Sequence, residues 1–159
     1  MLQGLNGQRE SEHHKYMLQA LKLAKTAYTN EEVPVGALVV KDNQIVGKGY
    51  NQTEMLKDPT AHAEMIAISS ACATLESKYL TGCTIYVTLE PCPMCAGAIV
   101  WSKISRVVFG AMDLKAGACG TLFNIASSKK LNSRAEVIHG IMETESTELL
   151  KKFFRERRK

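Results

Sequence analysis

The sequence has no apolar run long enough to cross a lipid bilayer. Its longest apolar stretches, such as residues 96–101, fall far short of the roughly 20 residues that a membrane-spanning helix needs. The first eight residues lack the apolar core of a signal peptide, and the chain has no internal repeat, low-complexity tract or linker-like segment. We therefore expect a single domain over residues 1–159, in a cytoplasmic protein with no membrane partner.

The cysteines do not form an even set that would suit a disulfide framework. There are five in 159 residues. In a chain without a secretory signal, metal binding and buried thiols are the more typical uses of cysteine. Cys72, Cys83 and Cys119 are expected to be small core residues. Cys92 and Cys95, three residues apart, are candidates for a shared chemical role.

The net charge is also modest, at +4. A charge of this size does not by itself identify a nucleic-acid-binding protein. The charge is unevenly distributed, however, since the last nine residues hold six basic residues and one acidic residue. A solvated basic tail is one interpretation of this run. Phe153 and Phe154 lie inside it, and basic residues interleaved with aromatic ones suit phosphates beside unstacked bases.

Hydrophobic periodicity predicts alternating helices and strands. The predicted helices cover residues 12–28 with Ser11 as a cap, residues 61–75, residues 91–101 and a terminal segment from about 146, with weaker helical signal over 121–126. The predicted strands cover residues 33–40, 45–50, 84–89, 106–110 and 136–139, the first two forming a hairpin. The helix between the third and fourth strands predicts that these two are parallel. We expect a three-layer α/β/α sandwich with a mixed five-stranded sheet.

Two motifs at predicted helix starts indicate a metal site. The first is His62-Ala63-Glu64, which follows the loop at 51–58 and the helix-entry residue Pro59, and the second is Pro91-Cys92-Pro93-Met94-Cys95. An imidazole and two thiolates fill three of the four positions of a tetrahedral zinc and leave one for water, as catalytic zinc sites do. The predicted ligands are therefore His62, Cys92 and Cys95.

Glu64 is not needed to complete this coordination, so it is free to move protons. Within a helix, residues two apart point nearly opposite ways, so His62 and Glu64 can share a site only beyond the helix end. Taken alone, the cysteine pair could be a redox pair or half of a structural zinc site, and His62 a core histidine. The joint pattern, H-x-E followed by P-C-x-x-C, is typical of zinc-dependent nucleobase deaminases.

Over nearly its whole length the sequence resembles the cytidine deaminase-like superfamily and, within it, the bacterial tRNA adenosine deaminases. The segments that carry this resemblance are residues 32–37, 49–51, 58–64, 86–92, 94–98, 106–111 and 153–155. The resemblance implies hydrolytic deamination of the wobble adenosine in a tRNA anticodon stem-loop to inosine. It further implies a homodimer with one Zn²⁺ per subunit and no organic cofactor.

The same resemblance implies roles for five further residues. Asn51 would hydrogen-bond the target base and Val33 would pack on its face. Asp113, Lys115 and Phe154 would lie near the flanking nucleotides. Each residue also has an ordinary interpretation: core packing for Val33 and Phe154, a solvated charge for Lys115, and a turn position for Asn51 or Asp113.

Two alternative functions share the zinc motif. A deaminase of a free base or nucleotide, of the guanine or cytosine type, would not bind RNA, so the basic tail and the glycine-rich loop at 113–120 argue against it. A non-catalytic subunit of deaminase fold, with structural zinc, would not require an acid/base carboxylate, and Glu64 is present.

Overall fold

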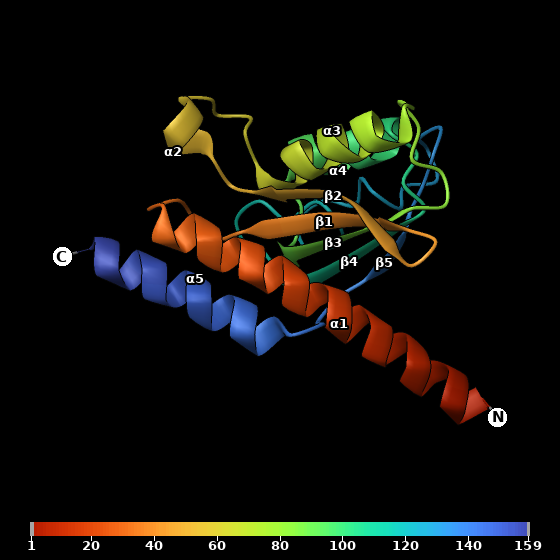
Figure 1. The fold of residues 1–159 in the computed structure, drawn as a ribbon, viewed down its shortest axis with the longest axis horizontal. Helices are drawn as coiled ribbons and strands as arrows, with labels where there is room; N and C mark the ends of the chain where they lie inside the picture. Colours follow the sequence, from red (N-terminus) through yellow and green to blue (C-terminus); the bar gives the residue numbers. More distant parts are fainter. Residues whose placement is uncertain (1, 159) are drawn as a thin grey trace.

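The computed structural model describes residues 2–158, with side chains from Gly7 onward, and shows one mixed sheet between two layers of helices (Figure 1). Met1 and Lys159 lie outside the described residues. Lys159 is the last residue of the basic run noted in the sequence. The elements in chain order are α1 (Leu2–Thr29), β1 (Gly36–Lys41), β2 (Gln44–Tyr50), α2 (Thr53–Leu56), α3 (Ala63–Leu75), β3 (Thr84–Leu89), α4 (Pro93–Trp101), β4 (Arg106–Ala111), β5 (Glu136–Ile138) and α5 (Glu143–Arg157).

The five strands lie in the order β2-β1-β3-β4-β5. β1 and β2 form the expected hairpin, in which Asp42 and Asn43 have positive φ angles of 49° and 62°, as a tight two-residue turn requires. β1 is also antiparallel to β3, whereas β3, β4 and β5 are parallel. The helix α4 makes the connection that the parallel β3–β4 pair needs. The predicted α/β/α sandwich is confirmed.

The two faces of the sheet carry separate hydrophobic clusters, because alternate residues of each strand point to opposite sides. Val39, Ile85 and Val107 face the layer of α3 and α4 and belong to the larger cluster. Their neighbours Leu38 and Tyr86 pack on the other face, in the smaller cluster with residues of α1. Figure 1 shows α3 and α4 together on one face and α1 and α5 on the other.

Two glycines in β2 allow α3 to lie unusually close to the sheet. A Cβ atom added at Gly47 would stand 2.4 Å from the carbonyl oxygen of Ala67, and one added at Gly49 would stand 2.4 Å from that of Ala63. Any side chain at these positions would push α3 away. The glycines therefore fix the height of α3, including its first turn, above the sheet.

The main errors of the sequence-based boundaries concern helix starts. α1 begins at Leu2, ten residues before the expected start, and Ser11 lies inside it rather than capping it. Gly4 and Gly7 weaken the helical signal there, but each costs only about 1 kcal/mol in a helix, and no proline interrupts the segment. α5 begins at Glu143, three residues before the expected start.

Three further expectations near the loops are wrong. Pro59 does not open α3, which begins four residues later at Ala63, and the expected 51–58 loop contains the short helix α2. Residues 121–126 are not helical. Asn124 instead pairs with Cys119 in an isolated antiparallel bridge, so its backbone is paired as in a strand and not as in a helix. Among the described residues, no helix is both long and apolar enough to span a bilayer.

Candidate active site

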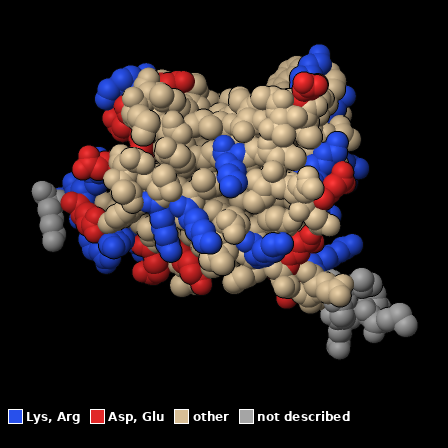
Figure 2. Space-filling model, in the orientation of Figure 1, with Lys and Arg blue, Asp and Glu red and all other residues tan. Residues whose placement is uncertain are grey.

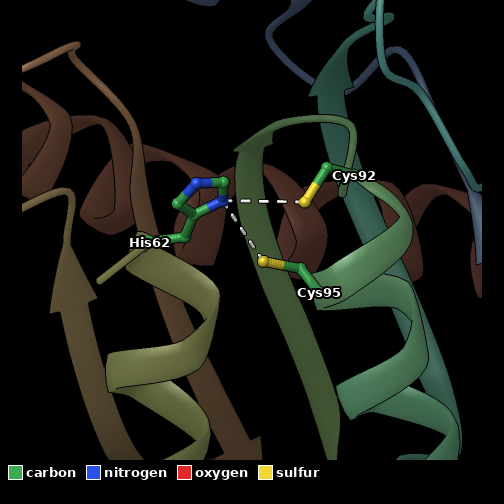
Figure 3. Close-up of side chains that lie close together, drawn as sticks. All are labelled: His62, Cys92 and Cys95. Atoms are coloured by element: carbon green, nitrogen blue, oxygen red, sulfur yellow. Dashed lines mark hydrogen bonds between the residues drawn. The ribbon is translucent and has the colours of Figure 1, made fainter. Parts of the chain in front are cut away.

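The three predicted metal ligands come together in the folded chain. His62 Nδ1 lies 3.6 Å from Cys92 Sγ and 3.5 Å from Cys95 Sγ (Figure 3). All three ligand atoms lie within 4.8 Å of one another. A tetrahedral zinc with Zn–N of about 2.0 Å and Zn–S of about 2.3 Å would hold its nitrogen and sulfur ligands about 3.5 Å apart. The spacing and the chemistry of the donors therefore fit zinc.

Two helix starts create this arrangement. His62 is the N-cap residue of α3 and Cys92 that of α4, and both have an extended backbone, with ψ angles of 152° and 175°. Pro93 follows as the first residue of α4, where proline suits a helix start. His62 is thus the cap residue just before α3, rather than a residue of the first turn as the predicted start at residue 61 implied. Because its backbone is extended, its side chain is not opposed to that of Glu64 as it would be inside a helix.

The electrostatics of the cluster favour a thiolate at Cys92. Hydrogen bonds from the Cys95 thiol and, more weakly, the His62 imidazole lower the pKa of Cys92 to about 4. The interaction with Cys92, together with burial, raises the pKa of Cys95, and the hydrogen bond to Cys92 raises the pKa of His62. The positive ends of the α3 and α4 dipoles also favour anionic sulfur. A divalent cation would bring both sulfurs to the thiolate form.

Glu64 is buried beside the cluster and lines the same cavity as His62 and Cys92. Burial raises the pKa of its carboxyl to about 7, although the interactions with its own backbone N–H and with His62 oppose that effect. A carboxyl that gains and loses a proton near neutral pH is suited to general acid and base catalysis. Its position beside the three ligands is the one expected from the sequence.

This cavity has a volume of about 270 Å³ and brings several sequence-predicted residues together. Val33, Asn51 and Asp113 contribute to its wall along with His62 and Cys92. Lys115 is exposed and is not among the lining residues. Phe154 lines a different hollow of about 400 Å³ on α5.

Hydrogen bonds fix the conformation of the two polar wall residues. The Asn51 side chain donates to the Val33 carbonyl at 3.3 Å and accepts from the Thr53 N–H at 3.4 Å. Asp113 Oδ1 accepts from the backbone N–H groups of Lys115 and Ala116, at 3.0 and 3.1 Å. Asn51 and Asp113 therefore make the local hydrogen bonds of turn residues, and both also line the wall of the cavity.

The sequence-based analysis assigned no role to some parts of the wall. Thr53 and Ala116 line the cavity, and two buried glutamates, Glu32 and Glu90, hold adjacent loops. The sequence signal that could have drawn attention to Glu90 is its charge within a largely apolar segment. Its partners lie 23 to 31 residues away, so no local pattern could identify them.

The other cysteines and the buried histidine behave as packing residues. Burial raises the pKa of Cys72, Cys83 and Cys119, that of Cys119 to about 12, so these thiols are not poised to ionise. Cys83 and Cys119 belong to the larger core, and Cys72 packs against it. His13 Nδ1 is hydrogen-bonded to the Tyr86 hydroxyl at 2.8 Å, and burial lowers its pKa.

Comparison with known proteins identifies the family. Residues 10–111, which include all three metal ligands, match the family model described as the cytidine and deoxycytidylate deaminase zinc-binding region. The chain is 50% identical over 145 residues to a tRNA-specific adenosine deaminase of Aquifex aeolicus, with 91% of this chain and 95% of the relative covered. It is 48% identical over 144 residues to the tRNA-specific adenosine deaminase of Bacillus subtilis, with coverages of 91% and 89%.

A solved structure supports the same assignment. It comes from work on A-to-I editing by tRNA:A34 deaminases at the wobble position of transfer RNA. It superimposes with a TM-score of 0.82 at 39% identity, covering 86% of this chain and 99% of that one. The chain therefore belongs to the tRNA-specific adenosine deaminases, zinc-dependent enzymes within the cytidine and deoxycytidylate deaminase family.

Proposed function

We propose that this chain, acting as one zinc-dependent domain over residues 1–159, converts the wobble adenosine of a tRNA anticodon loop to inosine. The observation that carries the proposal is the cluster of three metal ligands, His62, Cys92 and Cys95, two of which, His62 and Cys92, line one cavity with the buried Glu64. Its substrate would be encountered in the cytoplasm.

Glu64 acts as the proton-transfer residue in the proposed reaction. Zinc held by His62, Cys92 and Cys95 would supply a water molecule activated for attack near neutral pH. Glu64 accepts a proton from the attacking water and passes it to N1 of adenine. It then helps to protonate the amino group that leaves C6 as ammonia, so adenosine and water give inosine and ammonia. The pKa of about 7 suits both the uptake and the release of the proton.

The wall of the cavity binds the target base in this proposal. Asn51 lies at the wall with its amide fixed, so it can present a polar edge to the base, while Val33 offers an apolar surface to the ring. Asp113 contacts the neighbouring nucleotide from the opposite loop. Bases in an anticodon loop are already unpaired, so moving one into the cavity costs less than extracting it from a duplex.

The C-terminal helix provides the proposed contacts to the RNA backbone. Phe154 lines a hollow with Lys151, Arg155 and Arg158, so an aromatic ring lies among three cationic side chains. Figure 2 shows Lys and Arg side chains along the lower part of the displayed face, where Figure 1 places α1 and α5, with acidic side chains among them. Lys115, exposed in the 113–120 loop, is proposed to extend this surface toward the cavity.

We further propose that the enzyme is a homodimer. Trp101, at the end of α4, is 80% exposed. It borders a hollow of about 470 Å³ whose wall also includes Tyr79, Val100 and Leu131. Exposed apolar patches of this kind are typical of protein–protein contacts. A second copy of the chain would cover this face of α4.

The substrate assignment can be tested by parallel incubations of the purified enzyme with three compounds. We expect ammonia and inosine from an anticodon stem-loop with a wobble adenosine, and no ammonia from guanine or cytidine. Release from guanine or cytidine, with the stem-loop unchanged, would favour the free-base alternative and contradict the proposal.

The role of Glu64 predicts that Glu64→Gln separates metal binding from catalysis. Turnover should fall by about a hundredfold to ten-thousandfold because the proton-transfer group is lost, while zinc content is unchanged. Metal analysis and inosine formation measure the two effects. Glu76→Gln, at the exposed far end of the same helix, is the matched control and should behave like the wild type. Loss of zinc in Glu64→Gln would refute the assignment.

The role of α5 predicts weaker, less salt-dependent RNA binding in the double variant Lys151→Ala/Arg155→Ala. The slope of log affinity against log salt should decrease by about 1 for each phosphate contact removed. Point variants are preferred to truncation after Lys152, because truncation would delete the buried Phe153. Lys15→Ala, on the exposed side of α1, is the control. An unchanged slope would mean that this basic run is merely solvated.

The dimer proposal predicts that Trp101→Glu is monomeric at concentrations where the wild type is dimeric, because a charge cannot be buried unpaired at the interface. Analytical ultracentrifugation measures the mass of both proteins. Leu18→Glu, which alters an exposed leucine of α1, should still dimerise. A monomeric wild type, or a dimeric Trp101→Glu, would disprove the proposal.

A further inference from the structure

Two carboxylates that take no part in the proposed chemistry are almost completely buried, Glu90 in the wall of the cavity and Glu32 beside a loop that lines it. Glu32 has 1% of its surface exposed and Glu90 has 2%. Among the residues that the structure describes, the one ion pair joins Arg106 to Glu136, so neither of these glutamates has a cationic partner. A buried carboxylate is costly unless hydrogen bonds replace its water. The donors that satisfy Glu32 and Glu90 therefore indicate what these residues do.

Glu90 is bound by the loop of residues 113–121 through four hydrogen bonds. Oε1 accepts from the Asp113 N–H at 3.1 Å and from the Thr121 hydroxyl. Oε2 accepts from the N–H groups of Cys119 and Thr121, at 3.0 and 3.1 Å. The two ends of the 113–121 loop are thus attached to one side chain that directly follows β3.

The middle of the same loop also approaches Glu90 closely. A Cβ atom added at Gly117 would stand 2.5 Å from the carboxyl carbon of Glu90 and 2.6 Å from the carbonyl oxygen of Asp113. A glycine is therefore required for the loop to fold over the carboxylate. Asp113 and Ala116, which line the cavity, lie within this loop.

Glu32 makes an equivalent attachment for the loop of residues 51–58. Its Oε1 accepts from the N–H of Glu54 at 2.9 Å and its Oε2 from that of Met55 at 2.8 Å. These N–H groups belong to the first turn of α2, which receives no side-chain cap from its own N-cap residue, Gln52. Asn51 and Thr53, two residues of the cavity wall, lie in this loop.

We propose that Glu32 and Glu90 are positioning residues that hold the two cavity-lining loops, 51–58 and 113–121, in the conformation that accepts the RNA. This inference rests on the proposed function. Each carboxylate acts through backbone donors of its loop, and neither takes a role in proton transfer. A carboxylate is required because both of its oxygens accept hydrogen bonds, whereas glutamine has one accepting oxygen and an NH₂ group that would oppose the donors.

The test compares Glu32→Gln and Glu90→Gln with Glu10→Gln, a control at an exposed position of α1. Hydrogen exchange of the free, zinc-loaded protein is measured by mass spectrometry over residues 51–58 and 113–121. Zinc content, KM and kcat are measured with the anticodon stem-loop. Hydrogen exchange requires no RNA, so failure of the positioning role is distinguishable from failure of the proposed function.

Each variant should accelerate exchange in its own loop and leave the other loop unchanged. KM for the stem-loop should rise about tenfold with kcat within about threefold, because buried donors lose their acceptor while Glu64 and the ligands are untouched. Zinc content should equal that of the control. Unchanged exchange, an unchanged KM despite faster exchange, or loss of zinc would each overturn the inference.

Gly117→Ala tests the Glu90 contact without altering a charge, and it carries the test should Glu90→Gln fail to fold. The added methyl group displaces the loop from Glu90, so the exchange and KM effects should match those of Glu90→Gln. The double variant should be no worse than either single variant, because both disrupt one contact. Additive effects on KM would show that the two residues act separately and would contradict the positioning role.

Discussion

The meeting of two helix N-termini over one end of the sheet is the constraint on which the site depends. α4 starts directly after β3, so Cys92 and Cys95 lie near the carboxyl end of a parallel strand, where open α/β sheets commonly place their ligands. α3 lies on the same face of the sheet as α4, close to β2 because Gly47 and Gly49 leave room for it, and its first residue is near the same end of the sheet. His62 and Cys92, the two cap residues, are thereby brought within 3.6 Å of each other.

The three buried glutamates near the cavity differ in their partners and hence in their use. The carboxylates of Glu32 and Glu90 accept backbone N–H groups of neighbouring loops. Among the residues that the structure describes, none in a loop donates a hydrogen bond to Glu64, and burial raises its pKa to about 7. The same residue type thus occupies two environments: Glu32 and Glu90 accept hydrogen bonds from loops, with Glu90 in the cavity wall itself, and Glu64 is a titratable group beside the predicted metal ligands.

Local sequence patterns predicted the parts of the molecule that depend on local physics. The strand at 84–89 follows from its β-branched residues, and the fold class follows from the alternation of elements. The helix after this strand was predicted from residue 91, two residues before the observed start of α4 at Pro93. The metal ligands were predictable because their residue types and spacings are specific. The start of α1 was not, since glycines reduce helical propensity without ending a helix.

The rest depends on contacts between distant residues. Glu32 and Glu90 could be assigned only from hydrogen bonds that span 22 to 31 residues. Asn51 and Val33 line the metal cavity, whereas Phe154 lines a separate hollow on α5, and no local pattern indicates this separation in space. In the proposed function, the base and the flanking RNA are accordingly bound at different surfaces of the enzyme.

Zinc K-edge X-ray absorption on the purified enzyme tests the central claim most directly, because it reports the atoms bound to the metal. The account predicts two sulfur ligands at about 2.3 Å, one imidazole nitrogen at about 2.0 Å and one further oxygen at a similar distance. A shell closed by a fourth protein ligand, or a protein without stoichiometric zinc, would contradict a catalytic site at His62, Cys92 and Cys95.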